Sequence, residues 1–154
     1  KITSSLSMET ILTTVYESIN KLMKADGFGI DLYHPEQEEI EYKLFIERGE
    51  RLAPFTSSVH DEGSFSAWAI RNRKEVFLND VTKEYTTYIS KLKAVGAGEG
   101  EETHSAMYVP LIVEDRVVGV VTVQSFEPGA YTPADLDMLR ALGNYIAVAL
   151  DNAR

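Results

Sequence analysis

Residues 105–154 read SAMYVPLIVEDRVVGVVTVQSFEPGAYTPADLDMLRALGNYIAVALDNAR, and this stretch decides the fold. Its first half predicts two strands, over 105–113 and 116–126, with Glu114 and Asp115 at the turn between them. Two strands joined by so short a turn are expected to pair as an antiparallel hairpin.

The second half of this stretch predicts a long helix that continues to about the end of the chain. Thr132, Pro133 and Asp135 stand in the order of a capping box, with proline in the first helical position. Within the preceding strand, Gly119 indicates a place where another backbone approaches closely. A hairpin followed by a capped helix predicts a domain that mixes α and β structure.

The rest of the chain continues this mixture. Spacings of three and four predict an amphipathic helix through Met8, Ile11, Val15, Ile19 and Leu22. Alternation of period two then predicts a hairpin whose strands have apolar faces Phe28, Ile30, Leu32 and Ile40, Tyr42, Leu44, Ile46. In the middle we expect a short strand within 51–58, a helix over 64–72, a strand over 76–78, a helix over 83–93 and a mobile loop over 94–103.

Composition limits the classes of function that this chain can have. Its 154 residues suit one domain, and 15 basic against 24 acidic residues give a formal net charge of −9. An acidic surface repels phosphate, so we expect no nucleic-acid partner and no membrane contact. There is no apolar run of the ~20 residues that span a bilayer, and no signal peptide is visible. A cytoplasmic location is therefore expected.

The two ends of the chain suggest that it is part of a longer protein. The first residue is Lys1 rather than methionine, and the C-terminal helical pattern still runs at Arg154 without a glycine stop. We therefore expect residues 1–154 to be a single domain excised from a multidomain chain.

Three segments together resemble a GAF domain. They are the quoted stretch 105–154, GSFSAWAIRNRKEVFLNDV at 63–81 and ADGFGIDLYHPE at 25–36, and the resemblance covers essentially the whole chain. It implies an α+β (α/β sandwich) fold of the GAF/PAS-like kind, with a central antiparallel sheet of about five or six strands. The terminal helices would cover one face of this sheet, and short helices and loops would enclose a pocket on the other.

The resemblance also implies a function. Members of this family bind cyclic nucleotides, bilins, haem, amino acids or other small metabolites, and many precede a histidine kinase, a cyclic-di-GMP enzyme or a transcriptional ATPase. We therefore expect a regulatory sensory domain that binds a small molecule and relays the signal through its terminal helices to a fused output domain. The alternative is a dimerisation and relay module without a ligand.

Departures from the family pattern limit which ligands this domain can bind. The chain has no cysteine, which excludes a covalently attached bilin and the thiol chemistry of GAF-type methionine sulfoxide reductases. The Asn-Lys-x-Asp signature of phosphodiesterase GAF domains is also missing, which weakens the case for cyclic GMP. The identity of any cofactor or ligand stays open.

Candidate ligand-binding residues follow from the expected faces of the sheet. If Phe28, Ile30 and Leu32 pack beneath the terminal helices, Asp31 and Tyr33 point toward the pocket, unless Asp31 pairs with a lysine at the sheet surface. Ser64 begins a helix below the pocket, where it can favour an anion or serve as an ordinary N-cap. The resemblance further places at the pocket rim, roof and floor Asn79, Asp80, Tyr85, Tyr88, Tyr108 and Gln124.

Catalysis and metal binding find little support. His34 and His104 are expected to be solvated, whereas His60, beside Asp61 and Glu62, can contact a segment that covers the pocket or ligate haem or a metal. The three histidines have no metal-ligand spacing, so we expect no metal site. We expect that the domain is not an enzyme, because no nucleophile–base pair is visible. The alternative is a hydrolase that uses Asp31 or His60.

The C-terminal helix carries more apolar surface than one sheet needs. A second apolar stripe lies beside the first, which indicates a further partner, either the N-terminal helix or a second subunit. The resemblance favours pairing of terminal helices between subunits, and the interface would use Met8, Ile11, Val15, Leu139, Leu142 and Ile146.

Overall fold

The computed structural model describes residues 4–92 and 103–153. In these ranges the chain forms four α-helices, one 3-10 helix and seven strands, in the order α1 (Ser4–Leu22), β1 (Gly27–His34), β2 (Glu39–Glu47), β3 (Glu50–Arg51), β4 (Phe55–Ser58), α2 (Phe65–Asn72), β5 (Val76–Leu78), α3 (Val81–Glu84), η1 (Tyr85–Thr87), β6 (Ser105–Val113), β7 (Arg116–Ser125) and α4 (Pro133–Asn152). All strand pairs are antiparallel, in the order β3-β2-β1-β7-β6-β5, and β4 also pairs with β2. The expected α+β architecture is confirmed.

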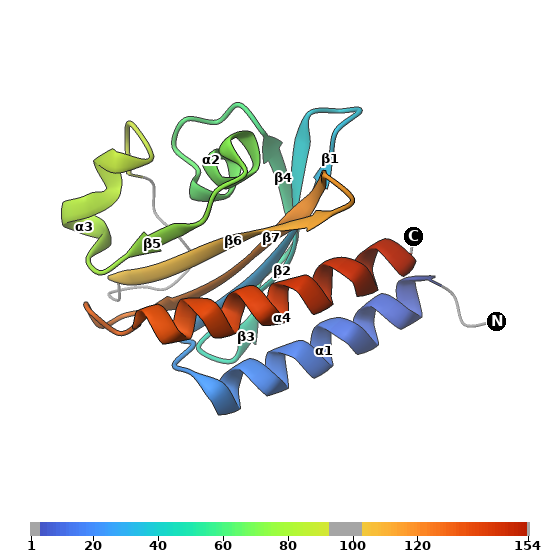
Figure 1. The fold of residues 1–154 in the computed structure, drawn as a ribbon, viewed down its shortest axis with the longest axis horizontal. Helices are drawn as coiled ribbons and strands as arrows, with labels where there is room; N and C mark the ends of the chain where they lie inside the picture. Colours follow the sequence, from blue (N-terminus) through green and yellow to red (C-terminus); the bar gives the residue numbers. More distant parts are fainter. Residues whose placement is uncertain (1–3, 93–102, 154) are drawn as a thin grey trace.

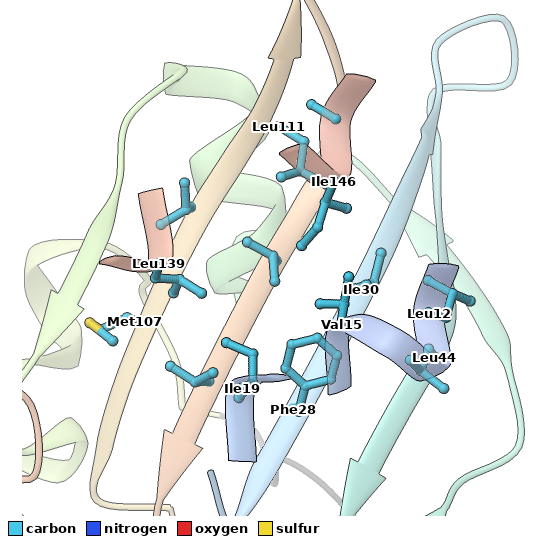
Figure 2. Packing of buried hydrophobic residues seen from close by; sticks show 14 of the residues in the cluster. Leu12, Val15, Ile19, Phe28, Ile30, Leu44, Met107, Leu111, Leu139 and Ile146 are labelled. Atoms are coloured by element: carbon cyan, nitrogen blue, oxygen red, sulfur yellow. The ribbon is translucent and has the colours of Figure 1, made fainter. Parts of the chain in front are cut away.

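The sheet separates two layers of helices (Figure 1). On one face α1 and α4 lie side by side, and their apolar stripes meet the sheet in a first core that includes Leu12, Val15, Ile19, Phe28, Ile30, Leu139 and Ile146 (Figure 2). On the other face α2, α3 and η1 cover a second core. None of the helices in the described ranges is both long and apolar enough to cross a bilayer.

The two sequence signals at the C-terminal end are confirmed. Asp135 N donates to Thr132 Oγ1 at 3.2 Å and Thr132 N donates to Asp135 Oδ2 at 2.9 Å. These two bonds complete the capping box that starts α4. In β7, a Cβ added at Gly119 would lie 2.1 Å from the Asp31 carbonyl oxygen of β1. The glycine therefore lets β1 and β7 approach each other.

The expectation that four apolar residues of β2 share one face is wrong. These residues are Ile40, Tyr42, Leu44 and Ile46. Ile30 pairs with Leu44 while Asp31 pairs with Tyr42, so the register shifts and Lys43 is left over as a β-bulge. One extra residue reverses the alternation, which puts Leu44 and Ile46 in the first core and Ile40 and Tyr42 against the second.

The short elements in the middle differ in part from the expectation. The strand within 51–58 is found as β3 and β4, and the helix over 64–72 is found as α2. The helix over 83–93 is wrong, because Asp80 caps a helix that begins at Val81 and ends as 3-10 turns at Thr87. Most of the loop expected over 94–103 lies outside the described residues.

Part of the expected dimer interface is also wrong. Val15, Leu139 and Ile146 are at most 1% exposed because they pack in the domain's own first core, so they are closed to a second subunit. Met8, Ile11 and Leu142 are partly buried against the same core, and their role in an interface stays a prediction. The apolar surface that α4 does expose includes Tyr145 and Val148, which are 58% and 53% exposed.

Candidate functional site

Asp31 lies on the face of the sheet that α2 covers, as the alternation in β1 predicts. Its side chain is 3% exposed, and Oδ2 accepts a 2.5 Å hydrogen bond from Ser66 Oγ in the first turn of α2. The partner is therefore a serine, and the alternative of a lysine at the sheet surface is wrong. Burial disfavours the charged form and raises the pKa of Asp31 to about 7, against the smaller opposing effect of the Ser66 hydrogen bond.

Tyr42 joins this buried polar region, although the sequence pattern placed it on the opposite face. Its hydroxyl lies 3.0 Å from Ser64 Oγ and 3.4 Å from Ser57 Oγ. Burial raises the pKa of Tyr42, and the nearby charge of Asp31 raises it further. Ser64 Oγ also accepts from Ala67 N at 3.0 Å. Ser64 is therefore the N-cap of α2, which was one of the two roles considered for it from the sequence.

Tyr108 and Gln124 lie side by side on β6 and β7 and form a second buried polar group. Gln124 Nε2 donates to the Tyr108 hydroxyl at 3.1 Å and lies 3.4 Å from Thr122 Oγ1. Thr103 Oγ1 donates to Gln124 Oε1 at 3.2 Å, which uses the other end of the amide. Burial and the nearby Asp31 raise the pKa of Tyr108, so this phenol stays protonated near neutral pH.

Aromatic side chains fill the space between this polar floor and the short helices. The rings of Tyr88 and Trp68 pack edge to face with their centroids 4.8 Å apart. Phe65 packs against Tyr88 at a centroid distance of 6.3 Å, and against Tyr108 at 5.4 Å. Tyr33 and Tyr85 also lie partly buried against the second core. These aromatic side chains therefore occupy space above Tyr108, where part of the pocket was expected.

An open cleft of about 510 Å³ lies further out. It is bounded by the β4–α2 connection, by α2 and by the segment from η1 to Ser90, and its lining residues are His60, Glu62, Arg71, Thr86, Tyr88, Ile89 and Ser90. Among the predicted binding residues, Tyr88 alone belongs to this described lining. The sequence allowed His60 to contact a segment that covers a pocket, and in the structure His60 lies in the cleft wall together with its neighbour Glu62.

Backbone contacts hold the walls of this cleft in place. Arg71 Nη1 donates to Val59 O at 2.8 Å and lies 3.2 Å from Asp61 O, which fixes the guanidinium against the β4–α2 connection. Ser90 N donates to Glu62 O at 3.2 Å and joins the two walls. Sequence reasoning missed Arg71, Thr86 and Ser90, because polar residues on short helices and turns are ordinarily solvated and give no signal of their own.

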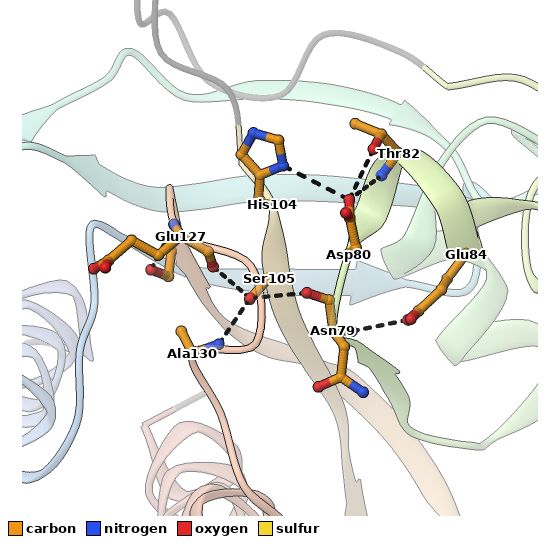
Figure 3. A network of polar contacts seen from close by, with 9 residues as sticks. Asn79, Asp80, Thr82, Glu84, His104, Ser105, Glu127 and Ala130 are labelled. Carbon is orange, nitrogen blue, oxygen red and sulfur yellow. Dashed lines mark hydrogen bonds and ion pairs between the residues drawn. The ribbon is translucent and has the colours of Figure 1, made fainter.

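Asn79 and Asp80, expected at the pocket rim, are outside the cleft lining and have structural contacts instead. Asp80 Oδ1 accepts from Thr82 N at 3.2 Å, and from Thr82 Oγ1 at 2.8 Å. Asp80 therefore caps α3, and these bonds lower the pKa of its carboxyl. Asn79 N donates to Glu84 Oε1 at 2.8 Å (Figure 3).

The histidines do not converge. His34 Nε2 lies 2.9 Å from Glu41 Oε1, and His60 Nε2 lies 2.5 Å from Glu38 Oε1. His104 Nδ1 lies 3.6 Å from Asp80 Oδ1. In residues 4–92 and 103–153, three or more acidic or histidine side chains are nowhere grouped to hold a metal ion.

Solved structures similar to this chain share its fold at low sequence identity. The type II free methionine-R-sulfoxide reductase from Thermoplasma acidophilum has a TM-score of 0.73 at 15% identity, over 97% of this chain and 94% of that one. The GAF-B domain of DevS from Mycobacterium smegmatis has a TM-score of 0.66 at 23% identity, over 95% and 94%. The GAF domain from an Acinetobacter phosphoenolpyruvate-protein phosphotransferase has a TM-score of 0.63 at 17% identity, over 96% and 92%.

Family membership rests on the sequence itself. Among curated proteins, no sequence matches this chain. A family model described as GAF domain matches residues 5–151, nearly the whole chain, and so the chain belongs to the GAF domain family.

Proposed function

We propose that this GAF domain is a regulatory sensory module that binds a small polar ligand in the open cleft and passes the resulting displacement to its terminal helices. GAF domains are typically sensory or regulatory modules. The observation that carries the proposal is the position of Tyr88, which lines the cleft on one side and packs against Trp68 and Phe65 in the domain interior on the other. A ligand that moves this ring moves the interior with it.

The cleft lining favours a ligand with several hydrogen-bonding groups. Its volume of about 510 Å³ lies within the range of small-molecule sites. The lining offers one carboxylate (Glu62), one guanidinium (Arg71), one imidazole (His60) and two hydroxyls (Thr86 and Ser90), beside the apolar surface of Ile89 and Tyr88. Such a mixed lining suits a compact ligand that carries both polar groups and one apolar face.

We propose that the domain is not itself an enzyme. The free methionine-R-sulfoxide reductases that share its fold are enzymes, but their thiol chemistry needs cysteine and this chain has none. Asp31 is enclosed beneath α2 beside Ser66, whereas His60 is exposed at the cleft and pairs with Glu38. These two groups therefore do not form a nucleophile–base pair with each other.

A dimerisation and relay module without a ligand is the second candidate. It is favoured by the filled space above the sheet and by the exposed apolar residues Tyr145 and Val148 on α4. In either case the output domain would be fused to the terminal helices, because these helices are the elements that can carry a displacement out of the domain.

The test is a thermal-shift screen of the domain against amino acids, nucleotides, cyclic nucleotides and polyols. A ligand present at 100 times its dissociation constant adds about 2.7 kcal/mol of stability, which raises the melting temperature of a domain of this size by roughly 5–10 °C. Thr86→Val should abolish this shift, and Thr87→Val, the exposed neighbour outside the cleft lining, should retain it.

Either outcome discriminates between the two candidates. If Thr86→Val and Thr87→Val change the melting-temperature shift equally, the ligand binds outside the cleft. A screen without any shift, combined with a melting temperature that rises with protein concentration, would favour the dimerisation module over the sensor.

A further inference from the structure

Ser105, the first residue of β6, joins parts of the chain that are far apart in the sequence. Its side chain is fully buried. Ser105 Oγ lies 2.5 Å from Glu127 O and 3.2 Å from Asn79 O, and it accepts from Ala130 N at 3.0 Å (Figure 3). One hydroxyl thus contacts both the residue before the α3 cap and the segment that leads into α4.

The α3 side of this junction is held by short contacts. Asp80 caps α3 through Thr82, and Val81 N donates to His104 O at 2.7 Å, directly before Ser105. Asn79 O accepts from Gly129 N at 2.8 Å in addition to facing Ser105 Oγ. A shift of α3 therefore acts directly on the partners of the Ser105 hydroxyl.

On the other side of the junction, the segment 126–131 contacts the residues that follow α1 and leads directly into the N-cap of α4. Asp26, just beyond α1, accepts from Phe126 N at 2.9 Å through Oδ2, and Tyr131 OH donates to Lys24 O at 2.7 Å. Thr132, the next residue, is the N-cap of α4. This segment is thus the place where a displacement can reach the end of α1 and the start of α4 together.

We propose that Ser105 is the residue that couples the position of α3 to the segment 126–131 and hence to both terminal helices. A hydroxyl suits this position because it accepts from Ala130 N while its single proton is shared between two carbonyls, Glu127 O and Asn79 O. The Asn79 contact is the one that joins the segment 126–131 to the α3 side. Alanine would leave buried backbone groups without this partner. That the coupling serves signalling rests on the sensory role proposed above, whereas the coupling itself is measurable without a ligand.

The experiment is amide hydrogen exchange by NMR on the whole domain, using a perturbation at α3. Asp80→Ala removes the cap of α3, and the readouts are the amides of Gly129 and Phe126, whose acceptors remain in every variant. Removing a cap of this kind shifts local opening by about fivefold. We expect both amides to exchange about fivefold faster in Asp80→Ala, and less than about twofold faster when Asp80→Ala is added to Ser105→Ala.

Two controls separate coupling from general loss of stability. Ser64→Ala removes the cap of α2 and leaves the Asn79, Glu127 and Ala130 contacts of Ser105 in place, so it should leave the Gly129 and Phe126 amides unchanged beyond global unfolding. If Ser105→Ala folds poorly, Ser105→Cys retains the shape with a weaker hydrogen bond and should give an intermediate response.

The proposal is overturned if Asp80→Ala accelerates Gly129 and Phe126 equally with and without the Ser105 hydroxyl. In that case the direct bond from Gly129 N to Asn79 O carries the coupling. It is equally overturned if Asp80→Ala leaves both amides unchanged in the otherwise native chain. Neither result depends on whether the cleft binds a ligand.

Discussion

Asp31→Asn tests the environment of the buried carboxyl through the pH dependence of stability. The native side chain is enclosed between β1 and α2, and burial raises its pKa from 3.8 to about 7. A group whose pKa is raised by folding stabilises the native state most when it is protonated. This contribution is complete below pH 3.8, falls as the pH rises toward 7 and is absent above that pH. Asparagine has the same shape and stays neutral throughout.

The magnitude follows from the width of this pH window. The folded-state pKa of about 7 lies about two pH units above pH 5. Each unit corresponds to about 1.4 kcal/mol. Between pH 5 and pH 8, the free energy of unfolding of the native protein should therefore fall by up to about 3 kcal/mol through Asp31 alone. Asp31→Asn should lack this fall, so that its stability relative to the native protein rises by the same amount.

The assay is urea denaturation at a series of pH values from 5 to 8. Asp115→Asn is the matched control, because Asp115 is exposed in the β6–β7 turn, and asparagine tolerates the positive φ that this residue adopts. That control should follow the native curve in parallel. Parallel curves for Asp31→Asn as well would mean that Asp31 ionises as it does in water, and the argument from its burial would be refuted.

Four further substitutions test the fold and its surfaces. Gly119→Ala would place a Cβ 2.1 Å from the carbonyl oxygen of Asp31, so urea denaturation should show a loss of more than about 3 kcal/mol. Gly143→Ala in α4 meets side chains at ordinary distances of 3.4 Å or more, and should be neutral or stabilising by up to about 1 kcal/mol; a loss as large as at Gly119 would contradict this contrast. Thr132→Ala removes the α4 cap and should cost about 1 kcal/mol; no change would show that the capping box contributes nothing. Tyr145→Glu, at a side chain 58% exposed, should leave the thermal stability of a monomer unchanged and dissociate any dimer formed through α4 in light scattering; a persistent dimer would place the interface elsewhere.

The parts of the fold that could be predicted are those fixed by local chemistry. The capping box at Thr132 satisfies the first amides of α4 with its own neighbours, so its meaning does not depend on distant contacts. Gly119 was informative for a related reason, because a missing side chain within a strand has few explanations other than close approach. The position of Asp31 followed from simple alternation along β1, which pairs with β7 in unbroken register from Gly27 to Leu32.

The second strand shows where such reasoning fails. Lys43 has no property that marks it as a bulge, yet its insertion opposite the junction of Ile30 and Asp31 turns Tyr42 toward α2. The hydrogen-bond partners Ser57 and Ser64 come from other elements, so the partly buried phenol of Tyr42 could be identified only after the sheet was assembled. Alternation predicts a face only while the register is unbroken.

The position of the cleft depends on packing rather than on any motif. Alternation aimed Asp31 toward α2, and the family resemblance placed Tyr108 and Gln124 on the pocket floor, but neither said what would stand above these residues. In the structure Phe65 packs against Tyr108, and Tyr88 packs between Phe65 and Trp68. The open cleft lies beyond these rings, and Tyr88 both lines the cleft and packs against the second core. The residues that could contact a ligand are therefore separated from the polar floor by one aromatic layer. A ligand in the cleft would reach the sheet through that layer, and replacing one of its rings should change the response of the terminal helices without removing a ligand contact at the floor.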